Sequence, residues 1–143
     1  MAANSRMTIG VHVLAWLALA KHQGHEVLTS SQIAASVNTN PVIIRRCLGD
    51  LRRAGLVSVI RGAGAGWSLA RAPEEITLVE VYDAVRPDPR FGLHHTEPNL
   101  ECPVGRGIRP ALSRVYGNVE DALRRELALV SVAEVLADTL RAR

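Results

Sequence analysis

The sequence is poor in cysteine: its 143 residues include two, Cys47 and Cys102, which lie far apart and lack zinc-finger spacing. This scarcity excludes a disulfide scaffold and favours a reducing cytoplasm. The sequence also lacks an apolar run long enough to span a bilayer. The segment Ile9–Ala20 follows Arg6 as in a signal peptide, but His12 interrupts it and its apolar residues share one helical stripe. We interpret it as a buried first helix and expect no membrane partner, with export as the alternative.

Nucleotide-binding loops are missing as well. The segment Gly62-Ala-Gly-Ala-Gly66 is rich in glycine, but it lacks the Lys-Ser/Thr of a phosphate-binding loop. A dinucleotide fingerprint must open a helix, whereas Trp67–Arg71 alternates like a strand. We therefore interpret the glycines as the tip of a β-hairpin, with Trp67 as its core anchor, and we expect no enzyme site.

The charge is distributed unevenly along the chain. Residues 1–72 hold eight Lys/Arg against two Asp/Glu, a net charge of +6, whereas residues 73–143 carry −3. A basic first half favours a polyanionic partner, although two solvated faces without a partner would have the same composition. The length and the 48% apolar content allow one compact chain with one core and an extended arm.

Residues 29–71 have the order of elements typical of a winged helix-turn-helix. A helix pattern at Ser31–Val37 precedes a polar turn at 38–40 and a second helix pattern at Pro41–Ala54. Two strand patterns follow, at Leu56–Arg61 and Trp67–Arg71. Within the second helix, Ile44, Leu48 and Leu51 are spaced to face the core. The fold class predicted is mainly α with a small β-hairpin, extended by a long C-terminal dimerisation helix.

The second helix of this unit carries side chains suited to reading DNA. A helix-turn-helix places the N-terminal turns of its second helix in the major groove, where Val42, Arg45 and Arg46 would lie. Arginine is suited to guanine and valine to the thymine methyl group. The alternative is that these arginines pair only with Asp50 or a phosphate. The other expected DNA contacts, to phosphates and from the wing, are Thr29, Ser30, Ser31, Asn40, Arg52, Arg53, Arg61, Gly62 and Gly64.

The rest of the chain divides into two further segments. Residues 73–106 contain a linker helix pattern at Ile76–Val85 and an irregular, proline-rich loop. Residues 107–143 predict a long helix from about Gly107 to Leu129 and a short helix after Ser131. An apolar stripe on the long helix predicts a two-fold dimer interface, and packing against the first helix is the alternative. The interface residues are Leu112, Val115, Val119, Leu123 and Leu127.

Four ordered motifs together resemble the Rrf2 (Rrf-two) family of bacterial winged-helix regulators, and most of all its YwnA-type branch. They are Asn38–Arg46, the Arg61-Gly-x-Gly-x-Gly-Trp wing, Ile76–Val85 and Cys102-Pro-Val-Gly105. The resemblance extends from Ser5 to Leu140. It implies a homodimeric transcription factor, usually a repressor, that binds a double-stranded DNA operator in the cytoplasm through its winged helix and dimerises through its long helix.

The resemblance also raises the question of a cofactor. The best-known members of the family bind an iron–sulphur cluster through three cysteines in the loop after the linker helix. This sequence has only Cys102 there, and a cluster needs about four ligands, most of them cysteine. We therefore expect no cofactor and no metal. The alternative is an iron–sulphur or zinc site that draws on His94, His95 and Cys102.

Cys102 is the candidate sensor of a regulatory signal. It lies just before the predicted long helix and close to Arg106 and Arg109, and helix N-termini and cations both stabilise a thiolate. Our hypothesis is that oxidants or electrophiles modify Cys102 and so weaken DNA binding. If Cys102 is inert, the signal enters through a small molecule between the linker and long helices, or through a partner protein. Two alternatives of other classes are a structural dimer that does not bind DNA and a cysteine-dependent enzyme.

Overall fold

Capping side chains determine where the two helices of the helix-turn-helix begin. The computed structural model describes residues 5–142 and starts with α1 (Arg6–His22) and α2 (Ser30–Val37). Thr29 caps α2, since its hydroxyl accepts a 3.1 Å hydrogen bond from the Gln32 N–H, while the Gln32 side chain accepts one from the Thr29 N–H at 2.8 Å. This capping box starts α2 one residue before the predicted Ser31. Asn40 caps α3 (Pro41–Arg53) by accepting from the Val42 N–H at 2.8 Å.

The apolar side of α3 faces the core, as its spacing predicts. Ile44, Leu48 and Leu51 are fully buried, in one cluster with Val13 and Leu14 of α1. Burying a side chain of this size contributes about 1.5–3 kcal/mol. The first helix is therefore a core helix, and α3 is held with its opposite side toward solvent.

The wing is a two-stranded antiparallel hairpin. Strands β1 (Val57–Ile60) and β2 (Gly66–Leu69) are shorter than the predicted 56–61 and 67–71, since their pairing extends only from Val57 opposite Leu69 to Ile60 opposite Gly66, where the glycine loop turns. Trp67 exchanges two backbone hydrogen bonds with Leu28, at 3.0 and 2.8 Å, and its side chain packs against the core. These contacts make Trp67 the expected anchor of the hairpin.

Three short elements close the compact body. The 3-10 helix η1 (Pro73–Glu75) leads to α4 (Leu78–Val85), which starts two residues after the predicted Ile76 because Thr77 is its N-cap. The last helix, α6 (Val132–Arg141), is capped by Ser131 and packs against α1 with Val132 fully buried. The segment 107–143 thus contains two helices with different surroundings. Residues 1–4 and 143 of the segments predicted at the two ends lie outside the described residues.

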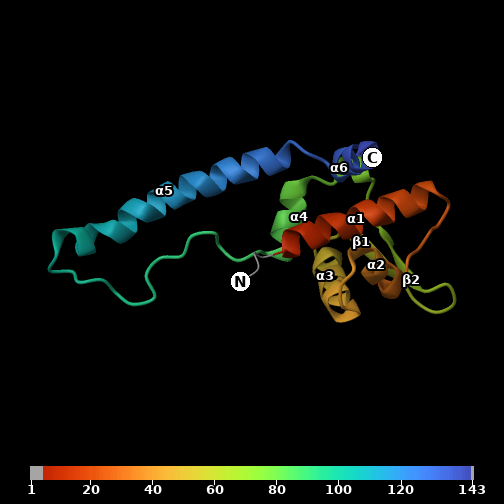
Figure 1. The fold of residues 1–143 in the computed structure, drawn as a ribbon, viewed down its shortest axis with the longest axis horizontal. Coiled ribbons are helices and arrows are strands. Elements are labelled where there is room, and N and C mark those ends of the chain that lie inside the picture. Colours follow the sequence, from red (N-terminus) through yellow and green to blue (C-terminus); the bar gives the residue numbers. More distant parts are fainter. Residues whose placement is uncertain (1–4, 143) are drawn as a thin grey trace.

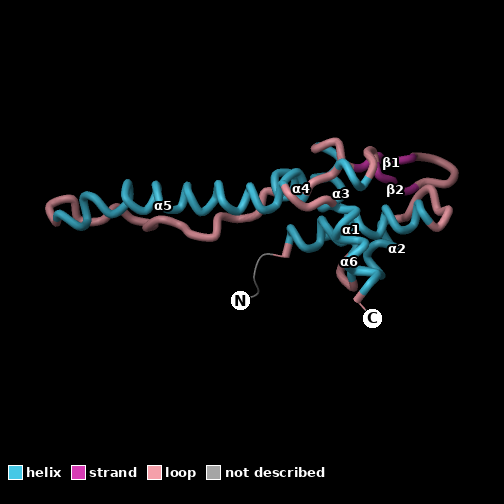
Figure 2. The backbone as a smooth tube through the Cα atoms, turned by 90° about the horizontal axis from the view of Figure 1, so that it is seen from above, coloured by secondary structure: helices cyan, strands magenta, loops and turns pink. Residues whose placement is uncertain are grey.

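After α4, the loop at residues 86–102 extends away from this body, and the long helix α5 (Pro103–Ala128) runs back to the body beside it (Figures 1 and 2). We call α5 and this loop the arm. No residue of α5 is buried, and its main contact with the body is α4 rather than α1. No helix within residues 5–142 has the length and apolar character needed to cross a membrane.

The arm helix starts one turn before the predicted Gly107. Gly105, Gly107 and Pro110 disfavour helix in the sequence, but Pro103 occupies the first helical position, where a missing N–H has no cost. The loop packs closely here, because a methyl group at Gly105 would overlap the Asn99 carbonyl oxygen. The glycine is therefore required for the loop to lie against the helix.

This geometry predicts opposite effects for two nearby glycines. Gly105→Ala should detach the loop from α5, whereas Gly107→Ala, with no atom within 4 Å of the new methyl group, should stabilise the helix by about 0.5–1 kcal/mol. Amide hydrogen exchange over residues 93–105 should accelerate in the first variant and not in the second. Equal exchange in both variants would contradict the close packing.

Candidate nucleic-acid interface

The predicted DNA-binding elements lie together on one side of the body. Helices α2 and α3 and the hairpin lie below α1 in Figure 1, on the opposite side from α6. The turn between α2 and α3 is tight, since Asn38 adopts a left-handed conformation with φ 60° and its N–H bonds to the Ala34 carbonyl. Asparagine tolerates this conformation better than most residues.

The first turns of α3 present both apolar and cationic groups to solvent. Val42 is 51% exposed and Ile43 is 45% exposed, while Arg45 and Arg46 one turn later are also exposed. Ile43 was not among the predicted contacts; it lies next to Val42 and off the core-facing stripe. Two adjacent large apolar side chains are therefore exposed at the start of α3, beside the two arginines.

Asp50 forms ion pairs, but not with Arg45 or Arg46, the two arginines that were predicted to read bases. It forms an ion pair with Arg53 on the same helix, and Arg6 Nη2 lies 3.8 Å from its Oδ2. Within residues 5–142, Arg45 and Arg46 form no ion pair. Their guanidinium groups are therefore available to an external acceptor.

The remaining predicted DNA contacts differ in whether their hydrogen-bonding groups are already engaged within the protein. The Thr29 hydroxyl and N–H are both engaged with Gln32, whereas Ser31 is exposed and Ser30 is half-buried. The Asn40 Oδ1 is used in the cap, which leaves its amide N–H groups. Arg52, Arg53 and Arg61 are exposed, and so is the wing tip, where Gly62 and Gly64 have φ of 85° and 72°.

The predicted dimer residues lie on the arm, away from this face. Val115 and Val119 are 46% and 41% exposed, and Leu112, Leu123 and Leu127 are half-buried. Between α4, α5 and the start of the loop lies a groove of about 1090 Å³, lined in part by Val119, Leu123 and Leu127.

Two polar contacts fix the base of the arm to α4. The Tyr82 hydroxyl donates to Glu120 at 3.1 Å, and Arg124 donates to both Asp83 oxygens at 2.5 and 3.0 Å. The bond from Arg124 holds the pKa of Asp83 below its ordinary value. Both anchors join the same two helices, α4 and α5.

Cys102 is exposed at the far end of the arm, where it is the N-cap residue of α5. The backbone N–H groups of Gly105 and Val104 favour the thiolate and lower the pKa of Cys102. Arg106 and Arg109, which were expected to stabilise the thiolate, are not among the causes of this shift. Arg109 instead donates hydrogen bonds to the His94 and Thr96 carbonyls, both at 2.9 Å. Cys47 behaves differently, because burial raises its pKa to about 11.

The match to known proteins covers nearly the whole chain. Residues 3–138 match the model of the Rrf2 family, described as an iron-dependent transcriptional regulator. The chain belongs to the Rrf2 family. It is 36% identical over 133 residues to YwnA of Bacillus subtilis (strain 168), which carries the name of a candidate HTH-type transcriptional regulator, with 93% of this chain and 96% of YwnA covered.

Solved structures show the same Rrf2 architecture. A crystal structure described as a candidate DNA-binding protein is 35% identical, with a TM-score of 0.73 and coverage of 92% of this chain and 99% of that chain. The structure of T. potens IscR has a TM-score of 0.72 at 21% identity and covers 100% of this chain and 91% of that one, which shows a shared fold. Membership confirms the expectation of a regulator rather than an enzyme.

The iron in the family description does not fit the residues of this Rrf2 protein. Within residues 5–142, no three His, Cys, Asp or Glu side chains come together as a metal-binding group. Cys102 is exposed at the tip of the arm, while Cys47 is buried in the core. Clusters need about four ligands with cysteine dominant, so we assign no step to iron.

The two thiols should differ in their reaction with iodoacetamide. Since only a thiolate reacts, the rate at Cys102 should rise with pH and reach half its maximum below the ordinary thiol pKa of 9.0. Cys47 should be labelled in the folded protein far more slowly and only near pH 11, because it is 8% exposed and its thiol pKa is raised. Mass spectrometry of Cys47→Ala and Cys102→Ser, each with one thiol, separates the two rates. Similar rates at neutral pH would refute the assignment.

Proposed function

We propose that this Rrf2 protein binds a double-stranded DNA operator as a homodimer and represses transcription. The observation that carries the proposal is the solvent-facing start of α3, with Val42, Ile43, Arg45 and Arg46 exposed and the arginines unpaired within residues 5–142. Helix-turn-helix proteins place this part of the second helix in the major groove. A dimer bound across a promoter represses by excluding other proteins from it. DNA as the partner implies action in the cytoplasm.

The proposed contacts divide into base readers and phosphate contacts. Arg45 and Arg46 offer the planar fork that fits guanine O6 and N7, and Val42 and Ile43 offer apolar surface to thymine methyl groups. The phosphate contacts are Thr29, Ser30, Ser31, Asn40, Arg52 and Arg53. Arg61, Gly62 and Gly64 would bring the wing tip to the backbone or minor groove. A net charge of +6 over residues 1–72 supports a polyanionic partner.

The homodimer is supported by the exposed apolar side of the arm. Leu112, Val115, Val119, Leu123 and Leu127 lie on α5, which buries no residue of its own within the monomer. A second copy related by a two-fold axis brings the same surface to cover it. It would also pair two recognition helices, as an inverted repeat in DNA requires.

Control of DNA binding through Cys102 is the finer part of the proposal. The thiol is exposed, its pKa is lowered, and Cys102 is the residue at the start of a helix that belongs to the proposed dimer interface. Hypochlorous acid converts a thiolate to a sulfenic acid and releases chloride, which adds a polar oxygen at the start of α5. A small-molecule signal is the second candidate, favoured by the groove between α4 and α5.

Replacing the base-reading arginines should weaken specific binding selectively. Arg45→Ala or Arg46→Ala should cost about 1–3 kcal/mol on DNA from upstream of the protein's own coding sequence, if that DNA holds the operator. Binding to random DNA at the same salt concentration should change much less. Fluorescence anisotropy measures both affinities. The control is Arg125→Ala on the arm, which removes one positive charge outside the proposed DNA interface. Equal losses of affinity on both DNAs would mean that these residues contact phosphates and do not read bases. If the parent protein shows no salt-dependent binding to DNA, the proposed DNA-binding function is refuted.

Oxidation should act through Cys102 alone. Hypochlorite treatment should weaken operator binding of the parent by roughly fivefold or more, the size of a typical coupling between distant sites. Cys102→Ser should bind like the reduced parent before and after treatment, and Cys47→Ala should respond like the parent. A response of Cys102→Ser equal to that of the parent would refute the thiol switch and leave DNA binding untouched.

A further inference from the structure

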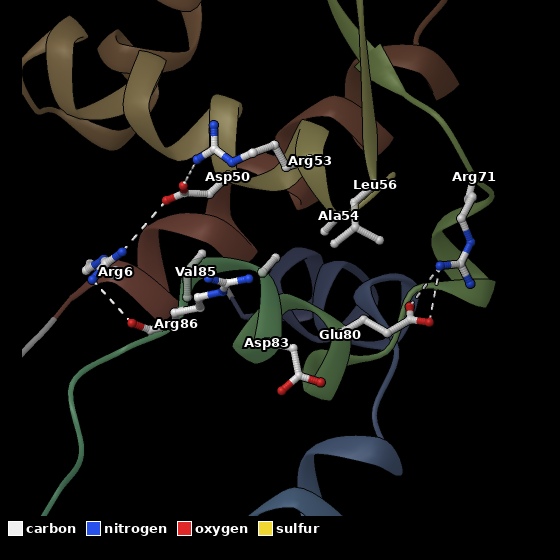
Figure 3. Close-up of a pocket in the computed structure, with 11 residues that line it drawn as sticks. Arg6, Asp50, Arg53, Ala54, Leu56, Arg71, Glu80, Asp83, Val85 and Arg86 are labelled. Carbon is white, nitrogen blue, oxygen red and sulfur yellow. Dashed lines mark hydrogen bonds and ion pairs between the residues drawn. The ribbon is translucent and has the colours of Figure 1, made fainter.

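A polar cavity separates the recognition helix from the base of the arm. It has a volume of about 440 Å³ and lies between the start of α1, the C-terminal end of α3 and α4 (Figure 3). Arg6, Asp50 and Arg53 border it on one side, and Glu80, Asp83 and Arg86 on the other. It adjoins the groove beside α5, with which it shares Asp83 and Arg86, but none of the proposed dimer residues lines it.

Two of the three acidic groups in this cavity are already committed. Both Glu80 oxygens accept from Arg71 Nη1 at 3.1 Å, and one also accepts from the Thr77 N–H at 3.2 Å. Both Asp83 oxygens accept from Arg124 of α5. Only Asp50 remains to balance the positive charge at the other end.

Asp50 cannot balance that charge alone. It is ion-paired with Arg53, and Arg6 approaches it as well. Figure 3 shows the Arg86 side chain reaching from the end of α4 into the cavity, and within residues 5–142 its guanidinium group has no ion pair or hydrogen bond. Even without Arg6, two guanidinium groups, those of Arg53 and Arg86, line the cavity together with a single carboxylate that is not bound by Arg71 or Arg124, that of Asp50.

We propose that this cavity binds a small anion with a phosphate or carboxylate group, held between Arg86 and Arg53. A guanidinium group donates two parallel hydrogen bonds to such an anion, and the cavity has room for a small organic molecule that carries it. The anion supplies the negative charge that Asp50 alone does not provide for both Arg53 and Arg86. Binding requires no covalent step.

The position of the site makes it regulatory, a consequence that rests on the proposed function. Arg53 belongs to the last turn of α3, whereas Arg86 caps α4 where the arm begins. Arg6 already links these two regions, since its Nη1 donates to the Arg86 carbonyl at 3.3 Å. An anion that bridges Arg53 and Arg86 fixes the recognition helix relative to the arm, and in a dimer this sets the separation of the two recognition helices.

Anion binding can be tested without DNA. Isothermal titration of the full chain with inorganic phosphate and with glycerol 3-phosphate, against chloride at equal ionic strength, should give saturable binding of one anion per chain. Arg86→Asn, whose asparagine tolerates the left-handed φ of 46° at this position, should weaken binding roughly tenfold or more through loss of a charge-assisted hydrogen bond. Arg90→Gln, a loss of charge outside the cavity, should leave it unchanged. Non-saturable binding, or equal binding by parent and Arg86→Asn, would overturn the proposal, and neither result bears on DNA binding.

The same variants distinguish the source of the anion. If it is a free metabolite, Arg86→Asn should bind DNA like the parent without added anion and lose the shift in DNA affinity that glycerol 3-phosphate causes. If it is a DNA phosphate, Arg86→Asn should weaken operator and random DNA equally and reduce the dependence of affinity on salt concentration. Either pattern supports an anion site.

Discussion

The apolar side of α3 packs against α1, and the position of every proposed base contact follows from this packing. Ile44, Leu48 and Leu51 are excluded from solvent completely, so the helix cannot rotate without exposing them. Val42, Ile43, Arg45 and Arg46 must then face outward. The Asn40 cap fixes the start of the helix, and with it the residues that would enter the major groove first.

The arm, in contrast to α3, is not held in place by buried apolar side chains. Its helix buries no residue in the monomer, and its polar contacts with α4 through Tyr82 and Asp83 lie only at its base. A second copy would cover the apolar side, and α4 would then connect the dimer interface to the recognition helix. The anion cavity lies on this connection, whereas Cys102 lies at the far end of the arm. An anion in the cavity and oxidation of Cys102 would thus both act on the contacts that connect α5, α4 and α3.

Local signals in the sequence were enough to predict much of the fold. The caps, the spacing of Ile44, Leu48 and Leu51 and the glycine loop each act within a few residues, and they gave the winged helix correctly. Contacts between distant residues could not be predicted in this way. The helix α6 packs on α1, from the other end of the sequence, and Arg6 of α1 forms an ion pair with Asp50 of α3.

The most direct test is selection of bound sequences from a library of random DNA duplexes, using the reduced protein. Since α3 is proposed to read bases and the arm to relate two copies by a two-fold axis, the enriched sequences should form an inverted repeat with defined half-sites. Recovery of no preferred sequence would contradict base reading. Recovery of a single asymmetric site would contradict the two-fold dimer on DNA.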